Sequence, residues 1–183
     1  MVTELGVTRC CPADAAQRAH RLAVVVTDND GVLTDGIVYV SAEGEQLKAY
    51  SVRDGMGVER LRNHGIATGV LTREPPALVA PRAAKLALRH LWTGVRDKHA
   101  FLPRILQDTG AALAQLAYIG DDLNDLDLLE TIGEVGLTAA PADAMPRVRD
   151  AVHYICSATG GRGAFREFAE WLLHLRSNSG GPS

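Results

Sequence analysis

Apolar runs alternate with amphipathic stretches along most of the chain. The runs at 22–27, 66–71 and 116–119 are continuous, which is typical of strands buried on both faces of a parallel sheet. Shorter strands are expected at 90–93, 135–138 and 153–155, and helices at 56–63, 77–88, 98–107, 123–132 and 165–175. This alternation predicts an α/β protein with a three-layer, Rossmann-like fold around a central parallel sheet.

The pattern also predicts one hairpin and two loose ends. Strand-like stretches at 37–40 and 46–52 flank a Ser-Ala-Glu-Gly turn, which indicates a β-hairpin. Residues 1–20 are weakly patterned, so we expect a loose leader there. We expect one domain over 21–176 and a flexible polar tail over 177–183.

Composition excludes several classes of protein. The chain has 183 residues, 46% hydrophobic and 22% charged, which suits one globular domain. A net charge of -3 with 5% aromatic residues argues against nucleic-acid or membrane-surface binding. No apolar run is long enough to span a membrane, and no signal-peptide pattern is found. Cys10 and Cys11 fit no disulfide or zinc pattern, so we expect a reduced, cytoplasmic protein.

Asp28 and Asp30 follow the first predicted strand. Taken alone, they are ordinary turn residues before a glycine. A calcium loop is excluded because its twelfth position is Tyr39 rather than glutamate. The functional alternative is a nucleophile and an acid/base, held near a phosphate by a hard cation.

A second acidic group, at 121–125, follows the strand at 116–119. Helix capping explains one or two of its acids. It explains poorly why Asp121 and Asp122 stand side by side, because the two carboxylates repel each other. A divalent cation would offset that repulsion, and ligands that are all oxygen suit magnesium. Thr72, at a strand end, and Lys98, at an expected helix start, are weaker candidates, since each has an ordinary structural explanation.

The order of these residues is more specific than any one of them. Asp-x-Asp-Gly is followed by Thr72, Lys98 and Gly-Asp-Asp-x-x-Asp, each at a strand end or helix start. The chain resembles the haloacid dehalogenase (HAD) superfamily over 22–175. It is most similar to the branch without a cap domain, which contains 3-deoxy-D-manno-octulosonate 8-phosphate and 2-keto-3-deoxynonulosonate 9-phosphate phosphatases. The segments that carry this closer similarity are 30–36, 52–57, 118–125, 141–144 and 160–167.

The resemblance implies a role for each acidic residue. Asp28 matches the nucleophile that forms an aspartyl-phosphate. Asp30 matches the general acid that protonates the leaving sugar oxygen and then activates water. Mg²⁺ is implied between Asp28, the backbone carbonyl of Asp30 and Asp121, with Asp122 close by.

Other residues match the phosphate site and an assembly. Thr72 and Lys98 match groups that bind the phosphoryl oxygens. Members of the branch resemble homotetramers, so we expect the hairpin at 37–52 to join subunits and a neighbour to cover the site. The glycine-rich segment 160–163 matches a mobile tail that presents Arg162 to a neighbouring site, and a plain flexible linker explains it equally well.

One loop departs from the branch pattern. Arg73 stands where the family has glycine, which puts substrate fit in question. Glu74, with Lys85 eleven residues later, matches the nonulosonate branch, whereas octulosonate enzymes tend to carry arginine at position 74. The expected function is therefore magnesium-dependent hydrolysis of a nonulosonic, sialic-acid-like sugar acid 9-phosphate. The alternative is 3-deoxy-D-manno-octulosonate 8-phosphate.

A non-catalytic alternative remains. Segment 151–172 resembles the C-terminal domain of animal CMP-sialic acid synthetases, which drives tetramerisation and lacks the aspartate nucleophile. The presence of Asp28, Asp30 and Asp121 in this chain favours an enzyme over an assembly module.

Overall fold

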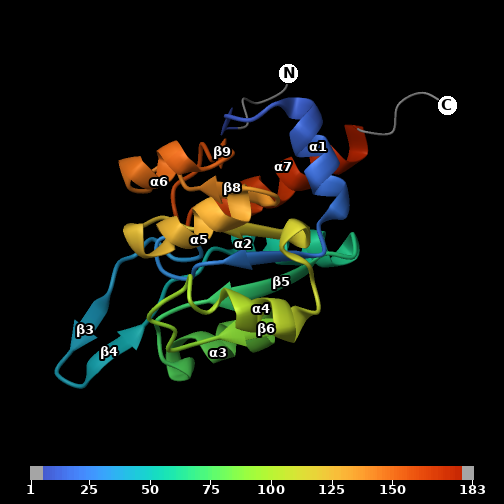
Figure 1. Cartoon of the computed structure of the whole chain (residues 1–183). Helices are drawn as coiled ribbons and strands as arrows, with labels where there is room; N and C mark the ends of the chain where they lie inside the picture. Colours follow the sequence, from blue (N-terminus) through green and yellow to red (C-terminus); the bar gives the residue numbers. More distant parts are fainter. Residues whose placement is uncertain (1–5, 179–183) are drawn as a thin grey trace.

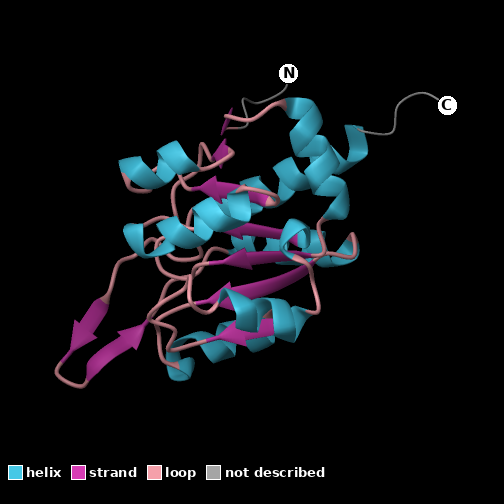
Figure 2. Ribbon diagram, viewed as in Figure 1, coloured by secondary structure: helices cyan, strands magenta, loops and turns pink. Residues whose placement is uncertain are grey.

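A seven-stranded sheet forms the middle layer of the molecule (Figure 2). The computed structural model describes residues 6–178. The strands of the sheet are β1 (Val7–Thr8), β2 (Val24–Thr27), β5 (Ala67–Leu71), β6 (His90–Trp92), β7 (Leu116–Ile119), β8 (Leu137–Ala140) and β9 (Tyr154–Ile155). Their order is β1-β9-β8-β7-β2-β5-β6, and only the β1–β9 pair among them is antiparallel. The predicted α/β fold with a parallel sheet is confirmed.

Helices cover both faces of this sheet (Figure 1). The hydrophobic cluster on one face takes side chains from α1 (Pro12–Arg21), α2 (Val52–Asn63), α3 (Pro76–Lys85) and α7 (Ala164–Asn178). The cluster on the other face takes them from α4 (Leu102–Thr109), α5 (Leu123–Gly133) and α6 (Pro146–Ala151). A short 3₁₀ helix, η1 (Leu113–Gln115), precedes β7.

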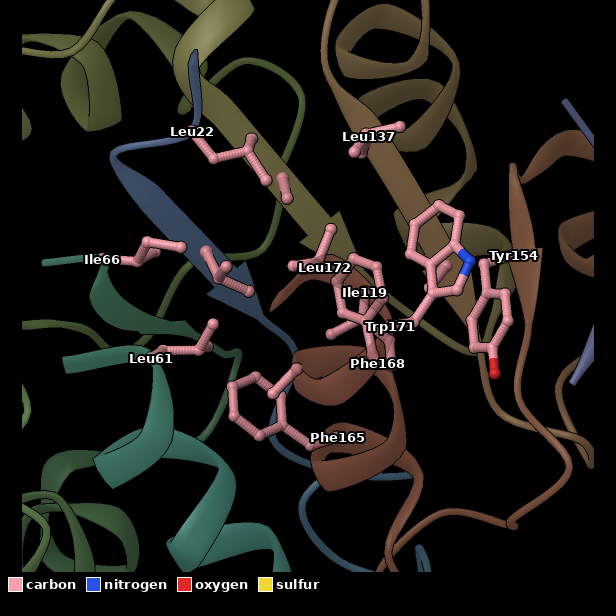
Figure 3. Packing of buried hydrophobic residues seen from close by; sticks show 14 of the residues in the cluster. Leu22, Leu61, Ile66, Ile119, Leu137, Tyr154, Phe165, Phe168, Trp171 and Leu172 are labelled. Carbon is pink, nitrogen blue, oxygen red and sulfur yellow. The ribbon is translucent and has the colours of Figure 1, made fainter. Parts of the chain in front are cut away.

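The core on the α7 face is built around aromatic side chains (Figure 3). Phe165, Phe168 and Leu172 repeat at helical spacing on α7 and are fully buried. Tyr154 of β9 stacks on Trp171 with ring centroids 4.6 Å apart. Burying each such side chain contributes about 2 kcal/mol, so α7 is anchored firmly to the sheet.

Strand β2 lies at the centre of the sheet. Val24 and Val26 pack into one core cluster and Val25 into the other, which explains the unbroken apolar run. Thr27, the last residue of β2, is in register with Val70 of β5 and Ile119 of β7. The carboxyl ends of these three neighbouring strands therefore meet at one edge.

The expected loose leader is wrong for the described part of the first twenty residues. Strand β1 pairs with β9, and α1 packs against α7 with Ala15 and Ala19 fully buried. Because alanines form the buried side of α1, the segment lacks the large apolar side chains that mark a buried helix face in a sequence. Ser177 and Asn178, expected in the tail, complete α7. Residues 1–5 and 179–183 lie outside the described part of the chain.

The predicted hairpin projects from the body of the molecule (Figure 1). It consists of β3 (Tyr39–Ser41) and β4 (Gly44–Leu47). The expected second strand was too long, because the Ser51 hydroxyl accepts hydrogen bonds from the backbone N–H groups of Arg53 and Asp54 and starts α2 at Val52. Val40 and Leu47 on this hairpin are 75% and 67% exposed.

Within residues 6–178, no helix combines the length and the apolar character needed to cross a bilayer.

Candidate active site

The predicted site residues converge at the carboxyl edge of β2, β5 and β7. Asp28 follows β2, Thr72 follows β5, and Asp121 comes two residues after β7. A cavity of about 290 Å³ opens there. It is lined by polar or charged side chains from three loops and one helix: Asp28, Asp30, Thr72, Arg73, Glu74, Lys98 and Asn124. This is the position where parallel α/β sheets bind ligands.

A buried lysine holds two carboxylates at the floor of the site. The Lys98 ammonium lies 2.7 Å from Asp28 Oδ2 and 2.6 Å from Asp125 Oδ1, and its side chain is 1% exposed. The Tyr118 hydroxyl also donates to Asp125 Oδ1. Burial lowers the pKa of Lys98, but the two carboxylates more than offset this and hold the pKa above its usual value. Lys98 is therefore a fixed positive charge beside Asp28.

Lys98 does not begin a helix, contrary to the prediction from the sequence. Helix α4 begins at Leu102, and Lys98 lies in the preceding turn. Asp97 Oδ1 accepts a hydrogen bond of 2.9 Å from the Ala100 N–H. Asp97 thus stabilises the turn, while Lys98 is buried among the site carboxylates rather than paired at the surface.

The turn after β2 packs closely against Asp121. The backbone N–H of Asn29 donates to Asp28 Oδ1 at 2.6 Å. Gly31 has φ +81°, and a Cβ there would lie 1.9 Å from Asp121 Oδ2. Only glycine suits this position, both for its backbone conformation and for its contact with the carboxylate.

Three carboxylates form a group that fits a hard cation. Asp28, Asp121 and Asp125 each offer an oxygen within 4.8 Å of the others. Asp121 Oδ1 is buried without a hydrogen-bond partner among the described residues. Burial and the neighbouring Asp125 raise the pKa of Asp121 to about 7. Burial and Asp125 also raise the pKa of Asp28, against the opposing effect of Lys98. A divalent cation with oxygen ligands would relieve this repulsion and take up the unpaired oxygen.

The acidic group differs from the expected set in one member. Asp122 is exposed and caps α5, accepting a hydrogen bond of 2.6 Å from the Leu123 N–H. Asp125, which resembled a first-turn helix acid in the sequence, lies in the cluster instead. Tyr118 could have indicated the place of Asp125 from the sequence, because a tyrosine inside a buried strand needs a hydrogen-bond partner for its hydroxyl. The side chain of Asp30 stays 34% exposed and faces the cavity.

The four residues linked to substrate choice lie in different places. Arg73 and Glu74 line the cavity. Lys85 is exposed at the last residue of α3 and is not among the lining residues of the cavity. Arg162 is exposed, with an ion pair of 3.3 Å to Asp35. The structure therefore brings Glu74, but not Lys85 or Arg162, to the cavity of its own chain.

The glycine-rich segment 160–163 packs on the turn after β2 of the same chain. The Gly161 N–H donates to the Val32 carbonyl at 2.9 Å. A Cβ on Gly160 would lie 2.0 Å from the Gly31 carbonyl oxygen. Glu167 of α7 accepts hydrogen bonds from the nearby backbone N–H groups of Ser157 and Ala158. In this conformation the segment supports the turn that carries Asp30.

Comparison with known proteins agrees with this geometry. No protein-family model matches the chain. The 3-deoxy-D-manno-octulosonate 8-phosphate phosphatase KdsC of Yersinia pestis is 38% identical over 160 residues, 87% of this chain and 84% of the relative. The cobalt-bound phosphatase of the same substrate from Haemophilus influenzae has a TM-score of 0.83 at 35% identity, covering 89% of this chain and 94% of that one.

A third relative was solved with ligands. The Moraxella catarrhalis phosphatase, in complex with magnesium, phosphate and KDO, has a TM-score of 0.83 at 34% identity over 90% of this chain and 93% of that one. A Legionella pneumophila structure of similar fold is described as a HAD superfamily hydrolase of subfamily III A. Sequence and fold thus agree over most of the chain, which belongs to the KdsC-type family of HAD phosphatases and is a phosphomonoesterase.

Proposed function

We propose that this protein is a magnesium-dependent phosphatase that hydrolyses the phosphate ester of a 2-keto-3-deoxy sugar acid through an aspartyl-phosphate. The observation that carries the proposal is the convergence of Asp28, Asp30, Thr72 and Lys98 on one cavity, beside a group of three carboxylates. A nucleophile, an acid/base, phosphate ligands and a cation site are the parts that phosphoryl transfer needs.

Asp28 and Asp30 divide the chemistry between them. A carboxylate oxygen of Asp28 attacks phosphorus, and the bond from phosphorus to the sugar oxygen breaks. Protonated Asp30 gives its proton to that oxygen, so the sugar acid leaves as an alcohol. In the second half, the Asp30 carboxylate takes a proton from water as the water attacks phosphorus. The bond from Asp28 to phosphorus then breaks, which releases phosphate and restores both carboxyl groups.

The remaining residues stabilise charge. Lys98 fixes Asp28 and supplies a positive charge next to the transferring phosphoryl group, and Thr72 offers its hydroxyl at a strand end. Asp28, Asp121 and Asp125, with the Asp30 carbonyl, would hold Mg²⁺. Bound there, the cation would neutralise charge on the phosphoryl oxygens.

Octulosonate 8-phosphate is our first candidate substrate. The named relatives at 37–38% identity act on it. The nonulosonic acid 9-phosphate is the second candidate, and its support is Glu74, which lines the cavity where octulosonate enzymes tend to carry arginine. Lys85, the other residue behind the nine-carbon expectation, adds no support because it lies exposed at the end of α3.

We also propose that the chain works as a homotetramer joined by its hairpin. The support is a row of exposed apolar side chains on and next to the projecting arm: Ile37, Val38, Tyr39, Val40 and Leu47. Such a patch is unusual on a monomer. Light scattering after gel filtration should give four times the chain mass, and a monomer for the Val40→Glu variant. A wild-type monomer would contradict the assembly.

Phosphate release from the two sugar acid phosphates, measured side by side with Mg²⁺, tests the function. Wild type should turn over one of them, and Asp28→Asn should abolish turnover while the fold, followed by circular dichroism, is kept. A preference of about tenfold for octulosonate 8-phosphate, equal to about 1.4 kcal/mol, supports the first candidate, and the reverse preference supports the second. No release from either, by a folded protein, would favour the assembly module.

A further inference from the structure

A second buried lysine lies at the rim of the cavity. The Lys48 side chain is 3% exposed, although it follows β4 on the projecting hairpin. Its ammonium lies 2.8 Å from Asp30 Oδ1, 3.1 Å from Glu45 Oε1 and 3.4 Å from Glu74 Oε2. An ammonium shielded from solvent between three carboxylates is a fixed feature of the site rather than a surface charge.

The three partners come from three separate parts of the chain. Asp30 belongs to the turn after β2, Glu45 to the hairpin, and Glu74 to the loop after β5. The three segments meet at the Lys48 ammonium. Lys48 therefore joins the acid/base residue, the arm and the loop that carries the substrate-linked Glu74.

The contact with Asp30 fixes the direction of that carboxyl group. Oδ1 accepts from Lys48 at 2.8 Å and from the Thr34 hydroxyl at 3.2 Å. Oδ2 has no hydrogen-bond partner within residues 6–178, and the side chain lines the cavity. With Oδ1 held, Oδ2 is the oxygen that can carry a proton to the leaving group.

We propose that Lys48 is a positioning residue for the proton transfer by Asp30, holding one carboxyl oxygen so that the other faces the leaving oxygen of the substrate. The proposal rests on the function proposed above. Lys48 itself exchanges no proton and touches no reacting atom. Its role is to reduce the ways in which Asp30 can point, which is how positioned groups gain rate.

The role of Lys48 is tested by how its replacement changes the rate with good and with poor leaving groups. The sugar of a sugar phosphate leaves as an unstable alkoxide unless Asp30 protonates its oxygen. From p-nitrophenyl phosphate, p-nitrophenolate leaves, which is a stable anion without a proton. Positioned general acids contribute about 10²-fold or more. Because Asp30 also serves as the base in the second half of the reaction with either substrate, the readout is kcat/KM, which reports only the steps up to departure of the leaving group. We therefore expect Lys48→Met to lower kcat/KM on the sugar acid phosphate about 50-fold, and kcat/KM on p-nitrophenyl phosphate less than about threefold. Lys48→Arg, which keeps a donor for Asp30, should restore most of the loss.

The controls separate this inference from the proposed function. The first measurement compares phosphate release from the sugar phosphate by wild type and by Asp28→Asn. If wild type is no more active than Asp28→Asn, both proposals are overturned. Arg104→Met removes a cation on α4 that pairs only with Asp108 among the described residues, and should leave both rates unchanged. An equal loss of kcat/KM on both substrates would show that Lys48 only stabilises the fold and would overturn the proposal. If Lys48→Met does not fold, Lys48→Arg carries the test, since a smaller loss confined to the sugar phosphate is still expected.

Discussion

Replacing Glu167 with glutamine should lower the melting temperature of this protein by several degrees. Five hydrogen bonds end on the Glu167 carboxylate. Oε1 accepts from the backbone N–H groups of Gly6 and Ser157 and from the Tyr154 hydroxyl, at 2.9, 2.8 and 2.9 Å. Oε2 accepts from the Ser157 hydroxyl and the Ala158 N–H, at 2.8 and 2.9 Å. The carboxylate thus joins β9, the entry to β1 and the segment before the glycine-rich loop.

The size of the effect follows from these partners. In Glu167→Gln, the amide NH₂ that replaces one oxygen would face the donor of Ala158 or of Gly6, and one buried N–H loses its acceptor. Such a loss costs about 1–3 kcal/mol, and the remaining bonds lose the strengthening given by the charge. Because Glu167 is partly exposed, solvent reduces the penalty, and we expect about 2 kcal/mol. For a chain of this size that equals a shift of about 4–8 °C.

The pH dependence gives a second, independent check. Burial raises the pKa of Glu167, but the backbone donors of Ser157, Gly6 and Ala158 more than offset this and leave the pKa below its usual value. The folded chain therefore binds the proton more weakly than the unfolded chain. The stabilisation is complete above the unfolded pKa of about 4.3 and is lost as pH falls through the lower, folded value.

The assay is thermal unfolding of wild type and Glu167→Gln between pH 3 and 8. The difference in stability should be constant from neutral pH down to about 5 and should shrink below about 4.3. Glu59→Gln on the exposed side of α2 is the matched control and should change stability by less than about 0.5 kcal/mol. A Glu167→Gln shift below 1 °C, or a difference that grows as pH falls, would refute the reasoning.

Two further predictions concern the cavity itself. Gly31→Ala should lower kcat/KM at least about 100-fold, because the new Cβ would displace Asp121 and a misplacement of about 1 Å costs that much. Gly44→Ala, at φ +98° with nothing within 4 Å, carries the same backbone strain and should keep its activity, so equal losses would contradict the crowding argument. Arg73→Gly should raise KM for the carboxylate-bearing sugar phosphate about tenfold, or about 1.4 kcal/mol, with KM for p-nitrophenyl phosphate unchanged, because Arg73 is the arginine that lines the cavity. Steady-state kinetics on the two substrates decides this, and a lower KM for the sugar phosphate would contradict it.

The central sheet was predictable because its signal is local. The unbroken apolar runs match β2, β5 and β7 within two residues at each end. Since these strands are neighbours, the residues that follow them had to lie together, and Asp28, Thr72 and Asp121 do. Helix α1 was not predictable in the same way, because its buried face is made of alanines such as Ala15 and Ala19.

The missed parts of the site depend on contacts across the fold. Asp125 has the local features of an ordinary helix-start acid, and only its burial against Tyr118 and Lys98 reveals its place. Lys48 contacts Asp30 across 18 positions of the chain, a distance that no short sequence pattern spans. Lysine usage held a clue: of the three lysines, Lys48 and Lys98 are buried beside the site acids, while Lys85, which the sequence had singled out, is exposed.

The group formed by Asp28, Asp121 and Asp125 has a consequence for how this chain evolves. Burial raises the pKa of Asp121 to about 7, so without a cation the fold loses stability as pH rises through that value. Exchanging Asp121 for asparagine would remove part of this like-charge repulsion without breaking an ion pair, whereas Asp28 and Asp125 are each paired with Lys98. A lineage that kept the fold only as a scaffold would therefore be free to exchange Asp121 for an amide, because nothing would oppose the gain in stability. We therefore expect the carboxylate of Asp121 to be kept only where the cation site is in use.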